Sequence, residues 1–135
     1  MKSNLTQFDT LEDLVIFLKE EAESNLRCEL CSMIGVSEEK KIVYKKMPNR
    51  SKNPIDFFII DPYDFLSFIK ENNCLCIFHT HLIGDEQPSD FDKMSSENCC
   101  YPFLIYSTTT EKFHIYEPEY KDYDVNIIQR LKELI

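Results

Sequence analysis

Apolar residues recur at helical spacing in several segments of the chain. In the first segment, Thr10 precedes the apolar run and Asp13 follows three residues later, which is a capping-box arrangement, so the pattern predicts a helix over residues 10–25. The apolar side of this helix is formed by Leu11, Leu14, Val15, Leu18 and Ala22. Three further helices are predicted to start at Asp61-Pro62, at Ser89 and near Ile127.

Shorter apolar runs between these helices predict strands. They lie at residues 27–36, 41–47, 55–60, 74–78, 102–107 and 112–116. The polar segment from Met47 to Pro54 is bounded by prolines and predicts a loop. The order of elements, α-β-β-β-α-β-α-β-β-α, indicates an α/β (α+β) fold class with a mixed β-sheet flanked by helices. No repeat or linker divides the chain, so we expect a single layered domain over residues 1–135.

Composition narrows the possible functions. The chain has 135 residues, 43% of them hydrophobic and 29% charged, which is enough to form a core. Its formal net charge of −9 argues against nucleic acid and against an anionic membrane surface as partners. Residues 1–13 lack the features of a signal peptide, and no apolar run is long enough to span a bilayer. The sequence therefore predicts a cytoplasmic protein.

Six cysteines form the main competing signal. Without an export signal, we expect reduced thiols rather than three disulfides. Cys28 and Cys31 form a CxxC pair, but both lie in a predicted strand, where residues three apart point to opposite faces. Cys74 and Cys76 are expected to share one face of their strand, opposite to the face of the histidines that follow. A second metal site built from cysteines stays open as an alternative.

The stretch from His79 to Asp92 carries the clearest candidate chemistry. His79 and His81 stand two residues apart at the end of an apolar strand. Residues i and i+2 of a strand point to the same face, so both imidazoles can converge on one metal ion. Asp92 is the natural third ligand, because it lies one turn into the helix that Ser89 opens. Taken alone, the Ser89-x-x-Asp92 spacing is also typical of a helix cap with an acid in the first turn.

This pattern resembles the JAMM motif of JAB/MPN-domain metallopeptidases. The chain reproduces the spacing of the motif as His79-x-His81, seven residues, and Ser89-x-x-Asp92. The motif also includes an upstream glutamate, usually followed by a short apolar run. Glu29 occupies that place fifty residues before His79, in the run Glu29-Leu30-Cys31-Ser32-Met33-Ile34.

The resemblance extends over nearly the whole chain. Ser32 stands where the family usually has glycine, so the match is imperfect around Glu29. Residues 58–62, which lead into a helix, and residues 102–105, which follow the motif, look like those of small prokaryotic and phage members. The resemblance implies a JAB/MPN-like fold with a cytidine-deaminase-like architecture.

The resemblance also implies a cofactor and a role for each residue of the motif. One zinc ion per chain would be held by His79, His81 and Asp92 and would activate a water molecule. Glu29 would take the proton of this water and pass it to the leaving amine. Ser89 would donate a hydrogen bond to the oxyanion that develops on the substrate.

The substrate implied by the resemblance is a ubiquitin-like protein or its conjugate. Members of the family cut peptide or isopeptide bonds after the C-terminal tail of such proteins, and small bacterial members occur beside conjugation-pathway enzymes, including in antiphage systems. This context places the chain in the bacterial cytosol or in a phage-infected cell. Two alternatives stay open: a phage tail-assembly or cell-wall-directed peptidase with the same site, and a non-catalytic MPN scaffold.

Overall fold

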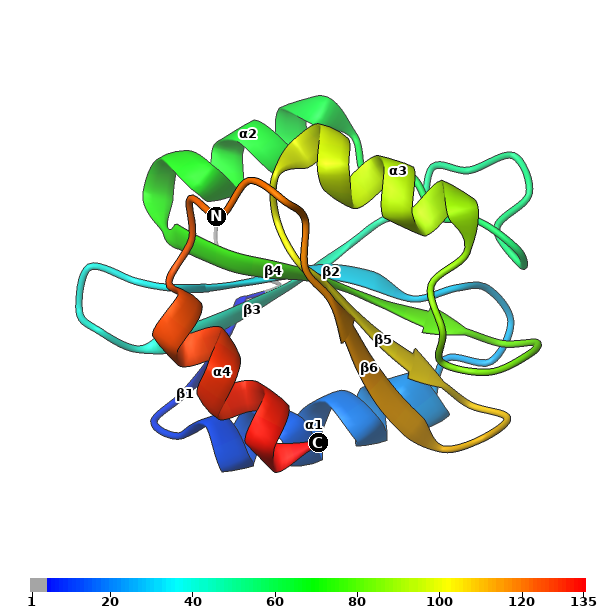
Figure 1. Cartoon of the computed structure of the whole chain (residues 1–135), viewed down its shortest axis with the longest axis horizontal. Coiled ribbons are helices and arrows are strands. Elements are labelled where there is room, and N and C mark those ends of the chain that lie inside the picture. The colour runs from blue at the N-terminus through cyan, green and yellow to red at the C-terminus, as the bar shows by residue number, and fades with distance from the viewer. Residues whose placement is uncertain (1–4) are drawn as a thin grey trace.

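A computed structural model describes residues 5–135 and shows a β-sheet covered by helices on both faces (Figure 1). The four helices are α1 (Leu11–Glu23), α2 (Pro62–Glu71), α3 (Asp90–Cys99) and α4 (Val125–Leu134). Helices α1 and α4 pack against one face of the sheet, and α2 and α3 lie on the other. The predicted α+β class with a mixed sheet between helices is confirmed, and the arrangement is compatible with one domain.

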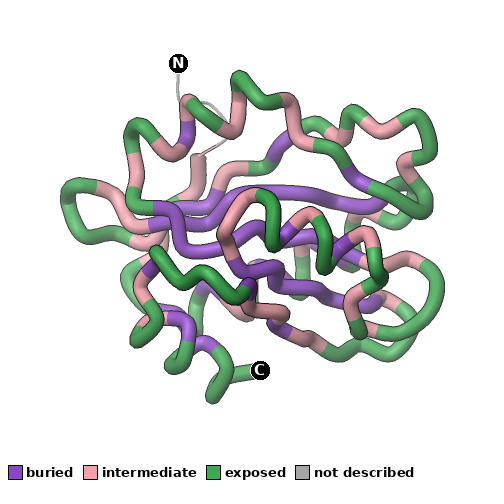
Figure 2. Tube along the Cα trace, turned by 45° about the horizontal axis from the view of Figure 1, so that its top comes forward, coloured by how far each residue is buried: buried purple, intermediate pink, exposed green. Residues whose placement is uncertain are grey.

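The sheet contains six strands. In chain order they are β1 (Leu5–Phe8), β2 (Cys31–Val36), β3 (Ile42–Met47), β4 (Asn73–His81), β5 (Phe103–Ser107) and β6 (Lys112–Tyr116). Their spatial order is β1-β3-β2-β4-β5-β6, with β4 and β5 parallel and the other pairs antiparallel. Strand β4 lies between two neighbours and is buried from Cys74 to Thr80 (Figure 2). Helices on both faces therefore explain its nearly continuous apolar sequence.

Side-chain caps determine where the helices begin. All four N-cap residues accept a hydrogen bond from a backbone N–H of the first turn, and they are Thr10, Asp61, Ser89 and Asp124. Helix α1 buries Leu11, Leu14, Leu18 and Ala22, as its apolar spacing predicted. Among residues 5–135, no helix has both the length and the apolar character needed to cross a membrane.

The strand predicted at residues 55–60 is wrong. This segment begins in a turn, and residues 57–60 are irregular and pair with no described strand. The side chain of Asn49 takes the place of a neighbouring strand: its Nδ2 donates to the Phe57 carbonyl at 3.0 Å, and its Oδ1 accepts from Ile59 N–H at 3.2 Å. Most of the segment is also not buried: Phe58 is buried, but Ile55, Phe57 and Ile59 are exposed.

The first two strands also differ from the sequence prediction. Strand β2 begins at Cys31, so the first residues of the predicted strand 27–36 lie outside the sheet. Cys28 is therefore exposed on irregular chain while Cys31 is buried in β2, and this separates the CxxC pair. Strand β1 was not predicted from the sequence, because its four residues, LTQF, are too few to show a periodic pattern.

The expectation that Cys74 and Cys76 share a face is wrong. The register between β2 and β4 shifts at this point: Ile34 pairs with Cys76 but Gly35 pairs with Cys74, so Leu75 is an extra residue. Cys76 consequently packs in the core under α1, together with Leu75, whereas Cys74 packs in the core on the opposite face. All six cysteines lie in the described part of the chain and are free thiols.

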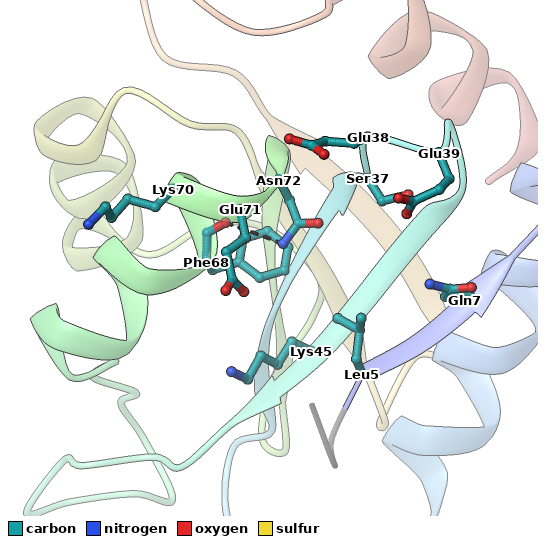
Figure 3. Close-up of a pocket in the computed structure, with 10 residues that line it drawn as sticks. All are labelled: Leu5, Gln7, Ser37, Glu38, Glu39, Lys45, Phe68, Lys70, Glu71 and Asn72. Atoms are coloured by element: carbon teal, nitrogen blue, oxygen red, sulfur yellow. Dashed lines mark hydrogen bonds between the residues drawn. The ribbon is translucent and has the colours of Figure 1, made fainter. Parts of the chain in front are cut away.

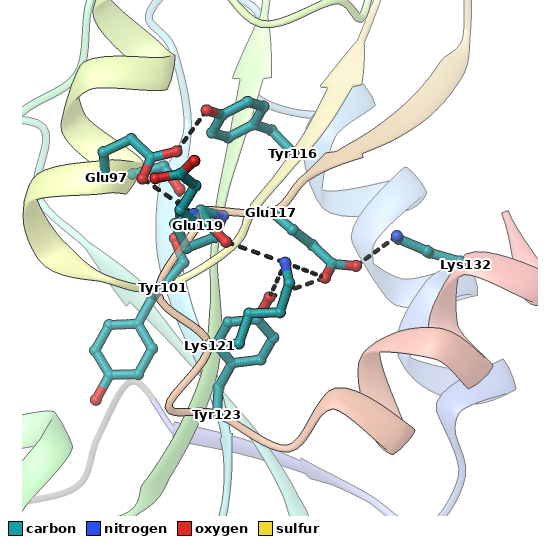
Figure 4. A network of polar contacts seen from close by, with 10 residues as sticks. Glu97, Tyr101, Tyr116, Glu117, Glu119, Lys121, Tyr123 and Lys132 are labelled. Atoms are coloured by element: carbon teal, nitrogen blue, oxygen red, sulfur yellow. Dashed lines mark hydrogen bonds and ion pairs between the residues drawn. The ribbon is translucent and has the colours of Figure 1, made fainter.

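A network of carboxylates, ammonium groups and phenols joins the chain after β6 to α4 (Figure 4). Glu117 pairs with Lys132 of α4 and with Lys121 at 3.1 Å, and the Tyr123 hydroxyl donates to it at 2.9 Å. Burial alone would raise the pKa of Glu117, but the hydrogen bonds from Lys132, Lys121 and Tyr123 outweigh it and lower the pKa from 4.5 to about 2. The network thus depends on the ionised form of Glu117.

This network predicts a loss of stability in acid. The pKa of Glu117 is lower in the folded than in the unfolded chain, so its contribution is complete above pH 4.5 and is lost as the pH falls toward 2. Over this interval, the free energy of unfolding from urea titrations should fall more in the wild type than in Glu117→Gln. The expected difference is only about 1 kcal/mol, because the ion pairs are partly exposed and are screened by solvent. The exposed neighbour change Glu119→Gln should leave the wild-type pH dependence in place. Parallel curves for the wild type and Glu117→Gln would contradict the prediction.

Candidate metal centre

The end of strand β4 presents two imidazoles to the face of the sheet that α2 and α3 cover. His79 and His81 lie beyond the register shift, in a regular part of the strand, so both side chains point the same way, as predicted. His79 pairs with Cys31 of β2 and with Ile105 of β5 in the middle of the sheet. The side chain of His79 is fully buried, while that of His81 is 13% exposed. The pair therefore lies where the buried sheet meets the surface.

Helix α3 brings Asp92 to the two histidines. Its carboxylate faces both rings: Oδ1 lies 3.2 Å from Nε2 of His79, and Oδ2 lies 3.0 Å from Nε2 of His81. Each of these three residues offers a ligand atom, and the three atoms all lie within 4.8 Å of one another. Within residues 5–135, no other group of three or more His, Cys, Asp or Glu side chains has this geometry. His79, His81 and Asp92 could therefore hold a metal ion.

The ring of His79 fits such an ion. Both of its nitrogens are buried and have no hydrogen-bond partner within residues 5–135, even though Nε2 lies close to Asp92. Buried polar atoms in folded proteins are rarely left without a partner. A cation among the three side chains would satisfy Nε2 and the carboxylate together.

Backbone groups orient the other two side chains. Nδ1 of His81 lies 2.8 Å from the carbonyl oxygen of Asp85, which can only accept, so Nδ1 carries a proton and Nε2 is the nitrogen directed at the site. The N–H of Ser89 donates to Oδ2 of Asp92 at 3.0 Å. Both contacts come from the loop and helix start that follow β4, so the same short stretch supplies the ligands and their orientation.

Two of the three side chains are already in the form that coordinates a metal. Burial alone would raise the pKa of Asp92, but its close contacts with the two histidine rings outweigh burial and hold the pKa well below its usual range. Burial lowers the pKa of His79. Burial would also lower the pKa of His81, but its contacts with Asp92 and Asp85 raise it. Asp92 is thus ionised and His79 neutral at neutral pH, which are the forms that coordinate metals. The contacts of His81 favour its protonated form, so metal binding there would release a proton.

Glu29 lies two residues before the start of β2 and is buried. Its backbone is held at both ends: the N–H donates to the Pro54 carbonyl at 2.7 Å, and the carbonyl accepts from Asn49 Nδ2 at 3.0 Å. Burial, reinforced by the charge of Asp92 and opposed by that of His81, raises its pKa from 4.5 to about 8. Glu29 is thus close enough to respond to these charges, although it does not belong to the group of converging ligand atoms.

Ser89 is the N-cap of α3. Its Oγ accepts from the N–H of Asp92 at 3.0 Å, and its own N–H donates to the Asp92 carboxylate, which completes a capping box. The cap interpretation of the Ser89-x-x-Asp92 spacing is therefore confirmed. It does not compete with the metal-ligand interpretation, because the same carboxylate also faces the histidines. Ser89 is exposed, so its hydroxyl proton can be donated outward.

Two residues near the site, Thr80 and Asn49, are given no role by the sequence. Thr80 is buried, and its Oγ1 accepts from the Leu30 N–H at 2.8 Å while its own N–H donates to the Leu30 carbonyl. This contact joins the histidine strand to the segment that carries Glu29. Asn49 binds the backbone of Glu29 and of residues 57–59. A single Asn in a polar loop gives no sequence signal for such a role, because Asn is common in loops.

A polar depression of about 280 Å³ lies at the opposite end of β4 from the histidines (Figure 3). It is lined by both acidic and basic side chains, among them Glu38, Glu39, Glu71, Lys45 and Lys70. It shares no residue with the metal-ligand group. The depression is therefore separate from the candidate centre.

Comparison with known proteins identifies the fold but no family. No protein-family model matches the chain, and no curated protein matches it significantly. Among solved structures, the fold is similar to the solution structure of protein DSY2949 from Desulfitobacterium hafniense, with a TM-score of 0.59 at 19% sequence identity. The similarity covers 84% of this chain and 92% of that chain. At this identity, the similarity concerns the fold alone.

Proposed function

We propose that the chain is a zinc-dependent metallopeptidase of the JAMM type, with a JAB/MPN-like domain. The observation that carries the proposal is the convergence of His79, His81 and Asp92, residues that were selected from the sequence by motif spacing. Ser89 caps the helix that presents Asp92, and buried Glu29 lies within the electrostatic range of the group. All five positions of the motif thus belong to one region of the molecule.

Zinc is the metal that best suits these ligands. Two imidazole nitrogens and one carboxylate are a donor set typical of catalytic zinc sites, which keep a further position for water or substrate. A zinc ion held there supplies a Lewis acid for a water molecule and for the carbonyl group of a substrate. His81 reaches the surface, so substrate can approach the centre from the side of the loop that follows β4.

Glu29 and Ser89 would carry the remaining chemistry. A carboxyl group whose pKa lies near the working pH is suited to take a proton from water and return it to the leaving amine. Glu29 has this property, because burial raises its pKa to about 8. A cation bound nearby would favour the ionised form of Glu29. The Ser89 hydroxyl already accepts from Asp92 N–H, and its free proton would stabilise the oxyanion of the substrate.

The proposed substrate is the C-terminal tail of a ubiquitin-like protein, cut at a peptide or isopeptide bond, with conjugation-pathway enzymes as further partners. Support comes from the resemblance of the His79-to-Asp92 stretch to the JAMM motif. The net charge of −9 agrees with a protein substrate better than with a nucleic acid.

The proposal is tested by metal content and cleavage together. The purified full chain should contain about one zinc ion per molecule by elemental analysis. It should also cleave fusions of ubiquitin-like proteins at the end of their tails, as read by mass spectrometry. Chelation should abolish cleavage, and added Zn²⁺ should restore it. A folded chain that binds no zinc would overturn the proposal, and zinc binding without cleavage of any such fusion would overturn the proposed substrate.

His114 supplies a matched control for the metal site. His81→Ala should lower zinc content and activity, because it removes one of the converging ligand atoms. His114→Ala removes a histidine of β6 that lies outside the group, so it should change neither zinc content nor activity.

A further inference from the structure

His79 lies in an unusual environment for a metal ligand. Ligating histidines in proteins almost always donate their second ring N–H to a carbonyl or carboxylate, and this contact sets the direction of the ring. His81 follows this rule through Asp85, but His79 does not, because neither of its nitrogens has a hydrogen-bond partner in the described structure. Something else must hold the ring in the direction that points Nε2 at the site.

The ring of His79 is instead held by two phenyl rings. Phe58 stacks on it with centroids 4.4 Å apart and an interplanar angle of 27°. Phe103 meets it edge-on at 5.4 Å and 76°, and the two phenyl rings also contact each other at 5.6 Å. All three side chains are buried. Rotation of the imidazole about its Cβ–Cγ bond would collide with the flat face of Phe58.

The backbone on either side of Phe58 is fixed as well. Asn49 donates to the carbonyl of Phe57 and accepts from the N–H of Ile59, so its one amide group brackets Phe58. The N–H of Arg50 donates to the Ile59 carbonyl at 2.8 Å. The segment therefore presents the Phe58 ring at a defined place although it belongs to no strand.

We infer that Phe58 is a positioning residue for the metal centre. Its stacked ring orients His79, a role that a hydrogen bond donated by the second ring nitrogen has in other ligating histidines. This inference rests on the proposed zinc site. It predicts that zinc affinity depends on the flat face at position 58 and not merely on apolar volume. Leucine fills a similar apolar space without such a face, whereas tyrosine keeps the face.

The test measures binding of Zn²⁺ alone to the full chain. Phe58→Leu should bind Zn²⁺ about tenfold more weakly than the wild type, the lower end of the loss seen when an orienting contact of a ligand is removed. Phe58→Tyr should bind within about twofold of the wild type, since it keeps the stacked ring. The visible absorption of bound Co²⁺, which reports ligand geometry, should change in Phe58→Leu and stay unchanged in Phe58→Tyr.

Phe57→Leu is the matched control. Phe57 is the neighbour in sequence, but the residue is 39% exposed and its ring packs edge-on against Phe91 instead of His79. It should keep wild-type affinity and Co²⁺ absorption. Wild-type affinity in a folded Phe58→Leu, or an equal loss in Phe57→Leu, would overturn the positioning role. Absence of Zn²⁺ and Co²⁺ binding in the wild type would overturn the proposed function itself, so the two failures are distinguishable.

Discussion

Replacement of Glu29 by glutamine is expected to lower the turnover of the proposed peptidase by roughly 10²–10⁴-fold, the usual contribution of a general acid–base residue. The amide is nearly isosteric with the carboxyl group but cannot take up a proton from water. The backbone contacts of residue 29 with Pro54 and Asn49 do not involve the side chain, so its position should be retained. Zinc content should also be retained, because Glu29 lies outside the converging ligand atoms.

The stability of the fold should not fall with the activity. Burial raises the pKa of Glu29 to about 8, so ionising this side chain in the folded protein is unfavourable. Glutamine removes that ionisation, and we expect Glu29→Gln without metal to unfold at the same or a higher urea concentration than the wild type at pH 9. A variant that is folded, zinc-loaded and inactive would thus separate catalysis from structure.

The exposed Glu38, in the turn between β2 and β3, provides the control. Glu38→Gln makes the same chemical change at the opposite end of β2 and should retain wild-type kcat/KM and zinc content. Cleavage by Glu29→Gln at a rate close to that of the wild type would assign the proton transfer to another group. Loss of zinc from Glu29→Gln would instead indicate that Glu29 is a zinc ligand.

The parts of the fold that the sequence predicts well are those determined by local contacts. Helix α1 was predicted over residues 10–25 and spans Leu11–Glu23, because a Thr10 cap and a buried apolar face act within one helix. His79, His81 and Asp92 could be grouped for a similar reason. A strand places the two histidines on one face, and a helix cap fixes the first turn that carries Asp92.

The parts that the sequence does not predict depend on contacts between distant segments. Glu29 and Thr80 are fifty-one residues apart in sequence, and hydrogen bonds between Thr80 and the backbone of Leu30 bring their segments together. The extra residue at Leu75 places Cys74 and Cys76 on opposite faces of the sheet, and no local sequence pattern indicates this register shift. Residues 55–60 are rich in β-branched and aromatic side chains like a strand, but the amide of Asn49 binds the backbone groups that a neighbouring strand would need. Side-chain substitutes for sheet pairing leave no periodic signal.

The largest effect on metal binding is expected from Asp92→Asn. The carboxylate is the one negatively charged ligand and faces both histidines, so its loss should weaken Zn²⁺ binding by more than the roughly 10–100-fold typical of changes around ligands. An asparagine oxygen can still accept from Ser89 N–H, so the helix cap should be retained. Without metal, the variant should be about 1 kcal/mol less stable, because it lacks the negative charge beside His81 and at the start of α3.

Thermal unfolding with and without Zn²⁺ separates these effects of Asp92→Asn. At a free Zn²⁺ concentration of 100 times its Kd, the wild type should gain about 2.7 kcal/mol, seen as a clear rise in Tm, whereas Asp92→Asn should gain little at the same concentration. Asp90→Asn is the matched control, because Asp90 lies in the same first turn of α3 but is exposed and outside the ligand group. Asp90→Asn should lose a similar amount of stabilisation at the start of α3 but should keep the full Zn²⁺-dependent rise in Tm. An equal Zn²⁺-dependent rise in Tm in Asp92→Asn and the wild type would place the metal elsewhere on the chain.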